Sequence, residues 1–229
     1  MSEEISMRPI GWVESCFGEK FGTPRQSGIV PEARGRVVFS DEVPSDASRG
    51  LEEFSHIWIV FLFDQVKEDE VRWFVRPPRL GGNYKKGVLA TRSPFRPNRI
   101  GISLVALESV SKGALEVSGL DLVEGTPVLD VKPYLPYAES LREADGGFAK
   151  EAPEPLAVEF CDEAKVGLSE ETMALIARVL AIDPRPAFHN DEERIYGCQL
   201  AGVNVKWQVK GGRVLVLSQE SLSSSQNIV

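Results

Sequence analysis

The sequence has 229 residues, of which 42% are hydrophobic and 26% are charged, and this composition is typical of soluble globular proteins. Its 26 basic and 34 acidic residues give a net charge of −8, which argues against general affinity for polyanions. No apolar run approaches the roughly 18 residues of a membrane span, and the acidic start MSEEISMRPIGW has no apolar core of a secretory signal. We therefore expect a cytoplasmic protein without membrane contact.

Short, strand-like runs dominate the first 135 residues. They are rich in Val, Ile, Leu, Phe and Trp and are separated by Gly, Pro, Ser and Asp, a pattern that favours a β-barrel or sandwich. We expect SHIWIVFLF to be a central strand covered on both faces, with a short helical turn at GLEEF before it. We expect His56 and the four tryptophans to belong mainly to the core. The predicted strands are RPIGWVES, GRVVF, SHIWIVFLF, GVLAT, IGISLVAL, ALEVSGL and PVLDVKPY.

The amino-acid composition changes after residue 138. Residues 139–155 are charged and contain Gly and Pro, as in a linker. LAVEFC then predicts a strand, and LSEETMALIARVLAI predicts a helix capped by Ser169, with Met173, Ile176, Ala177 and Leu180 as its apolar stripe. VNVKWQV alternates as a strand, and KGGR predicts a hairpin turn into VLVL.

These elements predict a mainly β fold in two domains. The N-terminal β-barrel takes residues 1–138, and a small α+β C-terminal domain takes residues 156–218 after the linker at 139–155. The tail at 219–229 has little to pack, and we expect it to be disordered. The three cysteines, Cys16, Cys161 and Cys198, are widely separated and only two histidines are present, so we expect no metal site and a reducing environment.

The charge is unevenly distributed. Residues 71–107 contain eight basic side chains and no Asp or Glu, so the remaining chain carries a net charge of −16. A basic zone on an acidic body indicates a localised anionic partner. The alternative is that these side chains are scattered around the barrel and serve solubility. The basic residues are Arg72, Arg76, Arg79, Lys85, Lys86, Arg92, Arg96 and Arg99.

Four polar clusters lie between the predicted strands. Each mixes hydrogen-bonding side chains with Gly or Pro, as expected for a binding pocket built from loops on a rigid scaffold. The sequence has no GxGxxG after a strand, no P-loop, no GxSxG and no HExxH, so any cofactor is held in another way. The clusters are GTPRQSG, FLFDQ, RPPRLGGN with ATRSPFRPNRIG, and SGLDLVEGTPVLDVKPY.

These clusters carry a resemblance to a known family. PRQSG, GLEEFSHIWIVFLF, RPPRLGGN, GVLATRSPFRPNRIG, GLDLVEGTPVLDVKPYLPYAES and DPRPAF together resemble the TsaA-like (YaeB/TrmO) family over essentially the whole chain. The resemblance implies a TsaA/YaeB-like barrel that binds S-adenosyl-L-methionine, and a methyltransferase acting on N6 of threonylcarbamoyladenosine at position 37, in the tRNA anticodon stem-loop. It also implies a homodimer.

The resemblance assigns the cofactor to residues in all four clusters, with Arg92 as the one candidate from the arginine-rich cluster. Arg25 or Arg92 would pair with the cofactor carboxylate, and Asp64 or Asp121 would take its ammonium or ribose hydroxyls. The alternative for Arg25 and Arg92 is a structural ion pair with Asp64 or Asp121. The cofactor-binding candidates are Pro24, Arg25, Gln26, Asp64, Gln65, Arg92, Ser118, Gly119, Leu120 and Asp121.

Basic side chains are the candidates for tRNA contact. We expect Arg92 to face inward and Arg96 and Arg99 to face outward toward phosphates, with the C-terminal domain assisting. Two positions depart from the family pattern: Arg99 stands where proline is usual and Phe188 where tyrosine is common, so a role for that hydroxyl is not carried over. The tRNA-binding candidates are Arg76, Arg79, Lys85, Lys86, Arg96, Arg99, Arg185 and Lys206, with Asp183, Tyr196 and Asn204 as further C-terminal candidates.

The sequence does not decide which residue accepts the proton from N6. The modified N6 must lose a proton, and Asp64, Asp121 or Tyr196 are candidate bases, with no catalytic residue assigned. Two other functions remain as alternatives: a barrel that binds S-adenosyl-L-methionine as a sensor without transferring its methyl group, and a methyltransferase acting on a different substrate.

Overall fold

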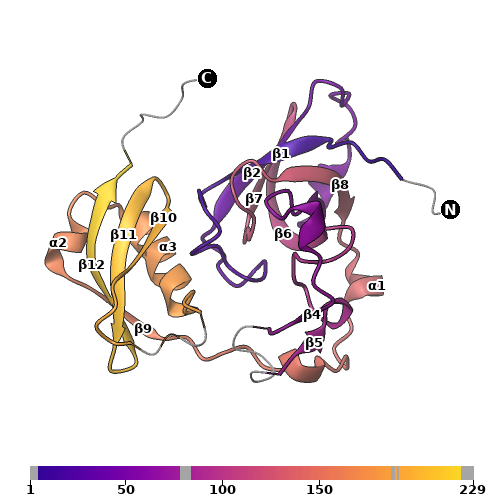
Figure 1. The fold of residues 1–229 in the computed structure, drawn as a ribbon. Helices are drawn as coiled ribbons and strands as arrows, with labels where there is room; N and C mark the ends of the chain where they lie inside the picture. The colour runs from indigo at the N-terminus through magenta and orange to yellow at the C-terminus, as the bar shows by residue number, and fades with distance from the viewer. Residues whose placement is uncertain (1–4, 78–83, 187–188, 190, 223–229) are drawn as a thin grey trace.

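A computed structural model describes residues 5–77, 84–186, 189 and 191–222 of the chain. Its main feature is a closed antiparallel barrel with strand order β1-β2-β7-β6-β3-β8. Figure 1 shows the barrel and, beside it, a separate C-terminal sheet. The mainly β class, with a small α+β part after the barrel, is therefore confirmed. The barrel strands are β1 (Gly11–Ser15), β2 (Arg34–Phe39), β3 (His56–Leu62), β6 (Ile100–Ser111), β7 (Ala114–Ser118) and β8 (Pro127–Pro133).

The barrel interior is filled by alternate residues of each strand. In β3 the buried positions are Ile57, Ile59 and Phe61, while Trp58 and Val60 between them are half-buried. Successive side chains of a strand point to opposite faces, so a barrel buries one face fully and leaves the other to solvent or to covering segments. The prediction that β3 is covered on both faces is wrong in that its outer face is only partly covered.

One close packing contact joins β3 to β6. Phe61 lies directly opposite Gly101 in the antiparallel register. A Cβ atom placed on Gly101 would lie 2.2 Å from the Phe61 ring, so the ring occupies the space that a side chain would need. Because Phe61 is buried and also packs edge-on against Phe63 at 4.9 Å, it has little freedom to move. Glycine is therefore required at this position by packing.

Short elements lie outside the barrel wall. The ribbon β4–β5 pairs Phe74 with Gly87 and Val75 with Lys86. GVLAT, which the sequence predicts as a strand, forms a 3₁₀ turn instead. The predicted helical turn at GLEEF is confirmed. These elements are β4 (Phe74–Val75), β5 (Lys86–Gly87), α1 (Pro136–Glu139), and the 3₁₀ turns η1 (Leu51–Glu53), η2 (Glu68–Glu70), η3 (Val88–Ala90) and η4 (Gly147–Ala149).

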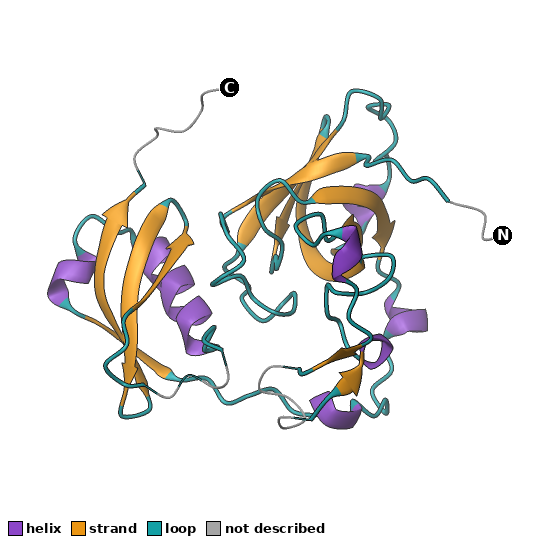
Figure 2. Ribbon diagram, viewed as in Figure 1, coloured by secondary structure: helices purple, strands orange, loops and turns teal. Residues whose placement is uncertain are grey.

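The C-terminal sheet has the order β10-β11-β12-β9, with β9 parallel to β12 and the other pairs antiparallel. Helix α3 lies against it, as Figure 2 shows. Ser169 caps α3 by accepting a hydrogen bond from the Thr172 amide at 3.1 Å, as predicted. The elements are β9 (Ala157–Phe160), α2 (Asp162–Lys165), α3 (Glu170–Ala181), β10 (Tyr196–Leu200), β11 (Val203–Lys210) and β12 (Arg213–Ser221).

Two sequence predictions for this sheet need correction. The buried face of α3 is Leu175, Ile176, Val179 and Leu180, one step from the predicted stripe, in which Met173 and Ala177 are only half-buried. Residues 219–221 of the predicted tail continue β12, where Gln219, Glu220 and Ser221 pair with β11. The predicted hairpin at KGGR is confirmed, since Gly211 and Gly212 both have positive φ, as the tight turn requires.

The barrel and the C-terminal sheet are joined by backbone contacts. The Ala201 amide donates to the Cys16 carbonyl at 2.9 Å, and Phe17 and Leu200 form a β-bridge. The Phe21 ring, from the loop after β1, stacks at 6.4 Å on both Tyr196 and Trp207. The loop after β1 therefore contacts both parts of the chain.

Several aromatic side chains lie elsewhere than expected. Trp207 is fully buried, but Trp12 and Trp73 are exposed and Trp58 is half-buried, with its indole nitrogen donating to Glu139 at 2.8 Å. His56 is exposed at the start of β3, where its ring contacts the Ser55 hydroxyl. The prediction of a core histidine is wrong because the strand's inward positions begin at Ile57.

Substituting Gly101 tests the packing requirement. We expect Gly101→Ala to lower the free energy of unfolding by about 1–3 kcal/mol, because the new methyl group would displace the Phe61 ring. Gly87→Ala is the matched control, since nothing lies within 4 Å of a Cβ at Gly87 and its φ of −61° suits any residue. Urea unfolding measures both variants, and equal stability of the two would contradict this role of Gly101.

Candidate functional site

The loop after β1 is fixed against the far end of β7. The Gly28 amide donates to the Gly119 carbonyl at 2.8 Å, and the Leu104 amide donates to the Ser27 hydroxyl at 3.0 Å. Gly119 has a φ of +73°, and a Cβ on it would lie 3.2 Å from the Gly28 Cα. Glycine is therefore needed at 119 both for its left-handed backbone and for the approach of the loop. Residues 24–28 and 118–121 are brought together in this way.

Asp121 is the most perturbed carboxyl group of this region. It accepts a hydrogen bond from the Ser103 hydroxyl at 2.5 Å. Burial raises the pKa of Asp121 to about 6, against the opposing effects of hydrogen bonds from Ser103 and from the Ser27 amide and of the charge of Arg92. An acid with this pKa exchanges a proton near neutral pH, which is the property of a general base or acid.

Arg92 and Gln26 form a second polar pair beside Asp121. The Arg92 guanidinium donates to the Gln26 side-chain oxygen at 2.6 Å, and the Gln26 amide nitrogen donates to the Arg25 carbonyl at 2.5 Å. Arg92 also lowers the pKa of Asp121 through its charge. Since these residues lie more than 60 positions apart in sequence, the fold and not local sequence assembles the pair.

This arrangement offers the groups that an amino-acid carboxylate and a ribose require. A guanidinium presents a two-point fork for a carboxylate, and the Asp121 carboxyl with the Ser103 hydroxyl can accept from an ammonium or hydroxyl donors. Pro24 is buried and Arg25 is exposed, with its guanidinium donating to the Arg185 carbonyl at 3.2 Å. Ser118 is buried and donates to Glu108, while Leu120 is fully buried. Pro24, Ser118 and Leu120 thus shape the loops through packing.

Asp64 and Gln65 lie at the exposed end of β3. They connect to the same loop as Gln26, because the Lys20 ammonium donates to the Gln65 carbonyl at 2.8 Å. The Asp64 carboxyl is exposed, unlike that of Asp121, so the two predicted acids occupy different environments.

The basic residues divide into exposed and engaged groups. Arg76 and Lys85 are exposed, whereas Lys86 is half-buried with its ammonium 5.2 Å over the Phe148 ring. Arg96 donates to the Thr91 carbonyl at 3.1 Å, and Arg99, with 18% of its side chain exposed, donates to the Val66 carbonyl and pairs with Glu68 at 2.9 Å. Arg79 lies outside the described residues.

The expected orientation of these arginines is therefore wrong. Arg92 is exposed, and Arg96 and Arg99 are half-buried. Arg99 has a φ of +50°, and its side chain donates to the Val66 carbonyl and pairs with Glu68, so it ties this loop to the segment after β3.

Candidates in the C-terminal domain are mostly held by neighbours. Arg185 forms a two-point ion pair with Asp183 at 2.8 and 2.9 Å, and the hydrogen bond to Asp183 raises the pKa of Arg185. Tyr196 is buried in the stack with Trp207, their rings 4.9 Å apart. Lys206 pairs with Glu220 at 3.2 Å, and Asn204 is half-buried beside it in β11. Phe188 lies outside the described residues.

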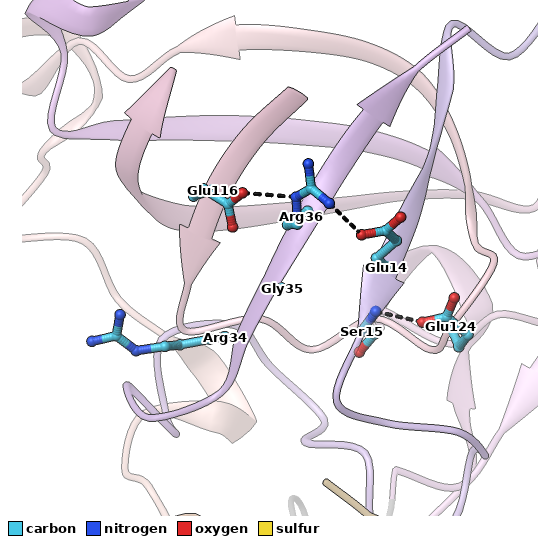
Figure 3. A pocket seen from close by; sticks show the side chains of 7 residues that line it. All are labelled: Glu14, Ser15, Arg34, Gly35, Arg36, Glu116 and Glu124. Atoms are coloured by element: carbon cyan, nitrogen blue, oxygen red, sulfur yellow. Dashed lines mark hydrogen bonds and ion pairs between the residues drawn. The ribbon is translucent and has the colours of Figure 1, made fainter. Parts of the chain in front are cut away.

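Two hollows lie away from this cluster. The first, of about 310 Å³, is shown in Figure 3: Arg36 bridges Glu14 at 2.9 Å and Glu116 at 2.7 Å, and the Ser15 amide donates to Glu124. Arg36 is held between two carboxylates there, and the hollow contains none of the predicted site residues.

The second hollow, of about 420 Å³, lies between the barrel and the C-terminal sheet and is lined in part by Cys16. Burial raises the pKa of the Cys16 thiol to about 11, so this thiol is not poised as a nucleophile. Within the described ranges, no three His, Cys, Asp or Glu residues are grouped so as to hold a metal ion. None of the described helices is long and apolar enough to cross a membrane.

Two residues of the cluster were missed by sequence reasoning. Ser103 is fully buried on the inner face of β6 and holds Asp121, and Ser27 receives the β6 amide. Ser103 is the one polar side chain in the run IGISLVAL, between the inward positions Gly101 and Val105. A buried hydroxyl at an inward strand position requires a partner, and that requirement was the available signal.

Removing the Asp121 charge tests its environment. A pKa raised by folding means that the folded state binds the proton more tightly, so stability falls as pH rises from about 4 to about 6 and stays lowered above that window. We expect Asp121→Asn to be relatively more stable than the parent chain at pH 8 than at pH 5, by on the order of 1 kcal/mol. Urea unfolding at both pH values measures this difference. A pH-independent difference between the two chains would refute the raised pKa.

Comparisons with known proteins agree with this architecture. Residues 12–140 match the tRNA-methyltransferase O N-terminal domain and residues 153–221 match the TrmO C-terminal domain. The tRNA (adenine(37)-N6)-methyltransferase of Escherichia coli is 47% identical over 214 residues, covering 87% of this chain and 91% of that protein. An S-adenosyl-L-methionine-binding protein of Archaeoglobus fulgidus is 35% identical over 140 residues, covering 61% of this chain and 96% of that protein.

A solved structure extends the likeness to three dimensions. The crystal structure of TrmO from Pseudomonas aeruginosa superposes with a TM-score of 0.80 at 36% identity, covering 96% of this chain and 99% of that one. The barrel, the C-terminal sheet and the order of the motifs thus match together. The chain belongs to the tRNA-methyltransferase O family.

Proposed function

We propose that this protein transfers a methyl group from S-adenosyl-L-methionine to N6 of threonylcarbamoyladenosine at position 37 of tRNA. Membership of the family makes the chain an S-adenosyl-L-methionine-dependent tRNA (adenine-37-N6)-methyltransferase. The threonylcarbamoyl group as a requirement of the substrate, the anticodon stem-loop as the recognised element, and a cytoplasmic homodimer as the working form are the further parts of the proposal.

The observation that carries the proposal is the cluster of Gln26, Arg92, Ser103 and Asp121 on converging loops and strands. Arg92 would bind the cofactor carboxylate, with Arg25 as a second cation on the same loop as Gln26. Asp121 and Ser103 would take ammonium or ribose hydroxyl donors, and Asp64 and Gln65 would lie at the rim. When bound, the cofactor supplies a methyl group on a positively charged sulfur.

Protein groups would then act mainly by positioning. Holding the attacking nitrogen in line with the methyl group converts binding into rate, because the encounter no longer costs orientation entropy. Of the three candidate bases, Asp121 suits proton removal from N6 best, since its pKa of about 6 lies near working pH, and in that role its carboxyl would accept the N6 proton in place of a donor of the cofactor. Asp64 is exposed to water, and Tyr196 is enclosed in the aromatic stack of the C-terminal sheet.

The basic candidates most suited to contact phosphates are those that are exposed and hold no ion pair within the described part of the chain. Arg76 and Lys85 are exposed and sit on the β4–β5 ribbon or next to it. Arg96 and Lys86 are half-buried, and Lys206 has an exposed partner in Glu220. Contact by Arg99 or Arg185 would require each guanidinium to leave an ion pair, with Glu68 or Asp183.

A second candidate function is cofactor binding without methyl transfer. This function is supported by the likeness to the S-adenosyl-L-methionine-binding protein of Archaeoglobus fulgidus, which covers 61% of this chain. The C-terminal domain, which that match does not require, favours the enzyme.

A methylation assay tests the proposed function. Labelled S-adenosyl-L-methionine is incubated with the protein and tRNA that carries or lacks the threonylcarbamoyl group. We expect transfer only to the carbamoylated tRNA. Equal transfer to both would remove the substrate requirement, and cofactor binding without any transfer would favour the sensor.

Replacing Arg92 tests the cofactor site. We expect Arg92→Gln to weaken S-adenosyl-L-methionine binding by about tenfold to a hundredfold, the usual effect of losing a hydrogen bond to a charged group. Arg49→Gln is the control, because Arg49 is exposed and pairs with Asp46 three residues before it. Calorimetry measures both affinities. Unchanged binding by the Arg92 variant would mean that another residue binds the cofactor carboxylate.

A further inference from the structure

The ribbon β4–β5 exposes an aromatic ring that no role described above uses. Phe74 in β4 is 67% exposed, and two aromatic neighbours in the same region, Trp73 and Tyr84, are 62% and 74% exposed. A ring of this size that stays in water does not gain the favourable free energy of burial. Exposed rings close together in the chain commonly mark an interaction site.

The register of the ribbon leaves one side of the Phe74 ring open. Phe74 is directly opposite Gly87, which has no side chain, and nothing lies within 4 Å of a Cβ built at Gly87. Directly opposed residues of an antiparallel pair share a face, so no described residue fills the place beside the Phe74 ring that a cross-strand side chain would take. A flat ring of a ligand has room at this position.

Charges beside the ring indicate what kind of ligand fits. Arg76 directly follows β4 and Lys85 directly precedes β5, which places each cation two residues from Phe74 or Gly87. Arg76 and Lys85 are both exposed, and residues 71–107 contain no acidic side chain. An uncovered aromatic ring flanked by cations is the combination that binds unpaired nucleotides.

The opposite face of the ribbon is turned to the protein. Val75 and Lys86 are paired there, and the Lys86 ammonium lies 5.2 Å over the Phe148 ring of η4. Val88, which donates its amide to the Trp73 carbonyl at 2.9 Å, is buried. The Phe74 face is therefore open to a partner, while Val75 and Lys86 on the other face are half-buried.

We propose that Phe74 is a stacking platform for one unpaired base of the bound tRNA, with Arg76 and Lys85 contacting the phosphates beside that base. The proposal rests on the proposed function in so far as tRNA is the partner. It adds a site outside the cofactor cluster, and it assigns affinity for the loop nucleotides to a ring rather than to charge alone. The occupant is single-stranded RNA, not a second copy of this chain.

Three substitutions test the platform without disturbing a packed core. Phe74→Leu removes the aromatic face and keeps apolar volume, Phe74→Tyr keeps the face, and Gly87→Leu fills the vacant place beside the ring while Phe74 remains. The control is Tyr137→Leu, which removes an even more exposed ring, 89% exposed, in α1. Affinity is measured with carbamoylated tRNA at fixed salt, and binding of S-adenosyl-L-methionine by calorimetry reports on correct folding.

We expect Phe74→Leu and Gly87→Leu each to weaken tRNA binding by about tenfold, the usual effect of losing one stacked base. Phe74→Tyr and Tyr137→Leu should bind as the parent does, and all variants should keep their cofactor affinity. A tRNA carrying 2-aminopurine at successive anticodon-loop positions should be quenched at one position by the parent and much less by Phe74→Leu.

The charges have a separate readout. Arg76→Gln and Lys85→Gln should each reduce the slope of log affinity against log salt by about 0.7, the value for one contact to single-stranded phosphate. Phe74→Leu should leave this slope unchanged, because stacking releases no counterions.

Several outcomes would overturn the platform. Unchanged tRNA affinity in both Phe74→Leu and Gly87→Leu, with the parent binding tRNA normally, refutes it and leaves the proposed function intact. Dissociation of an oligomer by Phe74→Leu in sedimentation would assign the face to a second copy. If the parent itself neither binds nor methylates tRNA, the proposed function fails first, and the platform fails with it.

Discussion

The candidate site depends on the contact between two glycines. Gly28 and Gly119 approach so closely that the loop after β1 lies against the end of β7, where the Gly28 amide donates to the Gly119 carbonyl. This contact brings Gln26 within reach of Arg92 and places the Ser27 amide beside Asp121. A side chain at residue 119 would separate the loop from the barrel, and the polar groups would no longer converge.

The closed barrel determines the electrostatics of that site. Ser103 lies on the inner face of β6 and can donate to Asp121 only because the strand is curved into the barrel wall. Burial destabilises the ionised carboxylate of Asp121. The Ser103 hydroxyl, the Ser27 amide and the charge of Arg92 stabilise it, but by less, so the pKa of Asp121 is raised. A bound cation or a departing proton changes this balance directly, which makes Asp121 responsive to what occupies the site.

Periodicity predicted the elements better than it predicted contacts. The alternation Val203, Val205, Trp207, Val209 gave the buried face of β11, and Ser169 was identified as the cap of α3. The prediction of a strand at GVLAT was wrong, because its apolar residues form a 3₁₀ turn between the ribbon and the loop that carries Arg92, Arg96 and Arg99. The pairing of Gln26 with Arg92 and of Ser103 with Asp121 depends on the strand order of the barrel, which residue spacing alone does not encode. Family resemblance, not periodicity, pointed to Arg92 and Asp121.

The basic zone is less cationic at the surface than its composition suggests. Arg99 is neutralised by Glu68, Arg96 is bonded to a backbone carbonyl, and the Arg72 guanidinium lies 4.0 Å over the Phe95 ring. Arg96 and Arg99 therefore organise the loop, and Arg72 makes a ring contact although it is exposed. A partner with a dense negative charge would still be repelled by the acidic remainder of the chain, which carries −16 outside residues 71–107. Recognition of a polyanion by such a protein needs an attraction that does not depend on net charge. An open aromatic face next to two exposed cations supplies it, and because bases in a duplex are not available for stacking on a side chain, it also favours a loop over a helix.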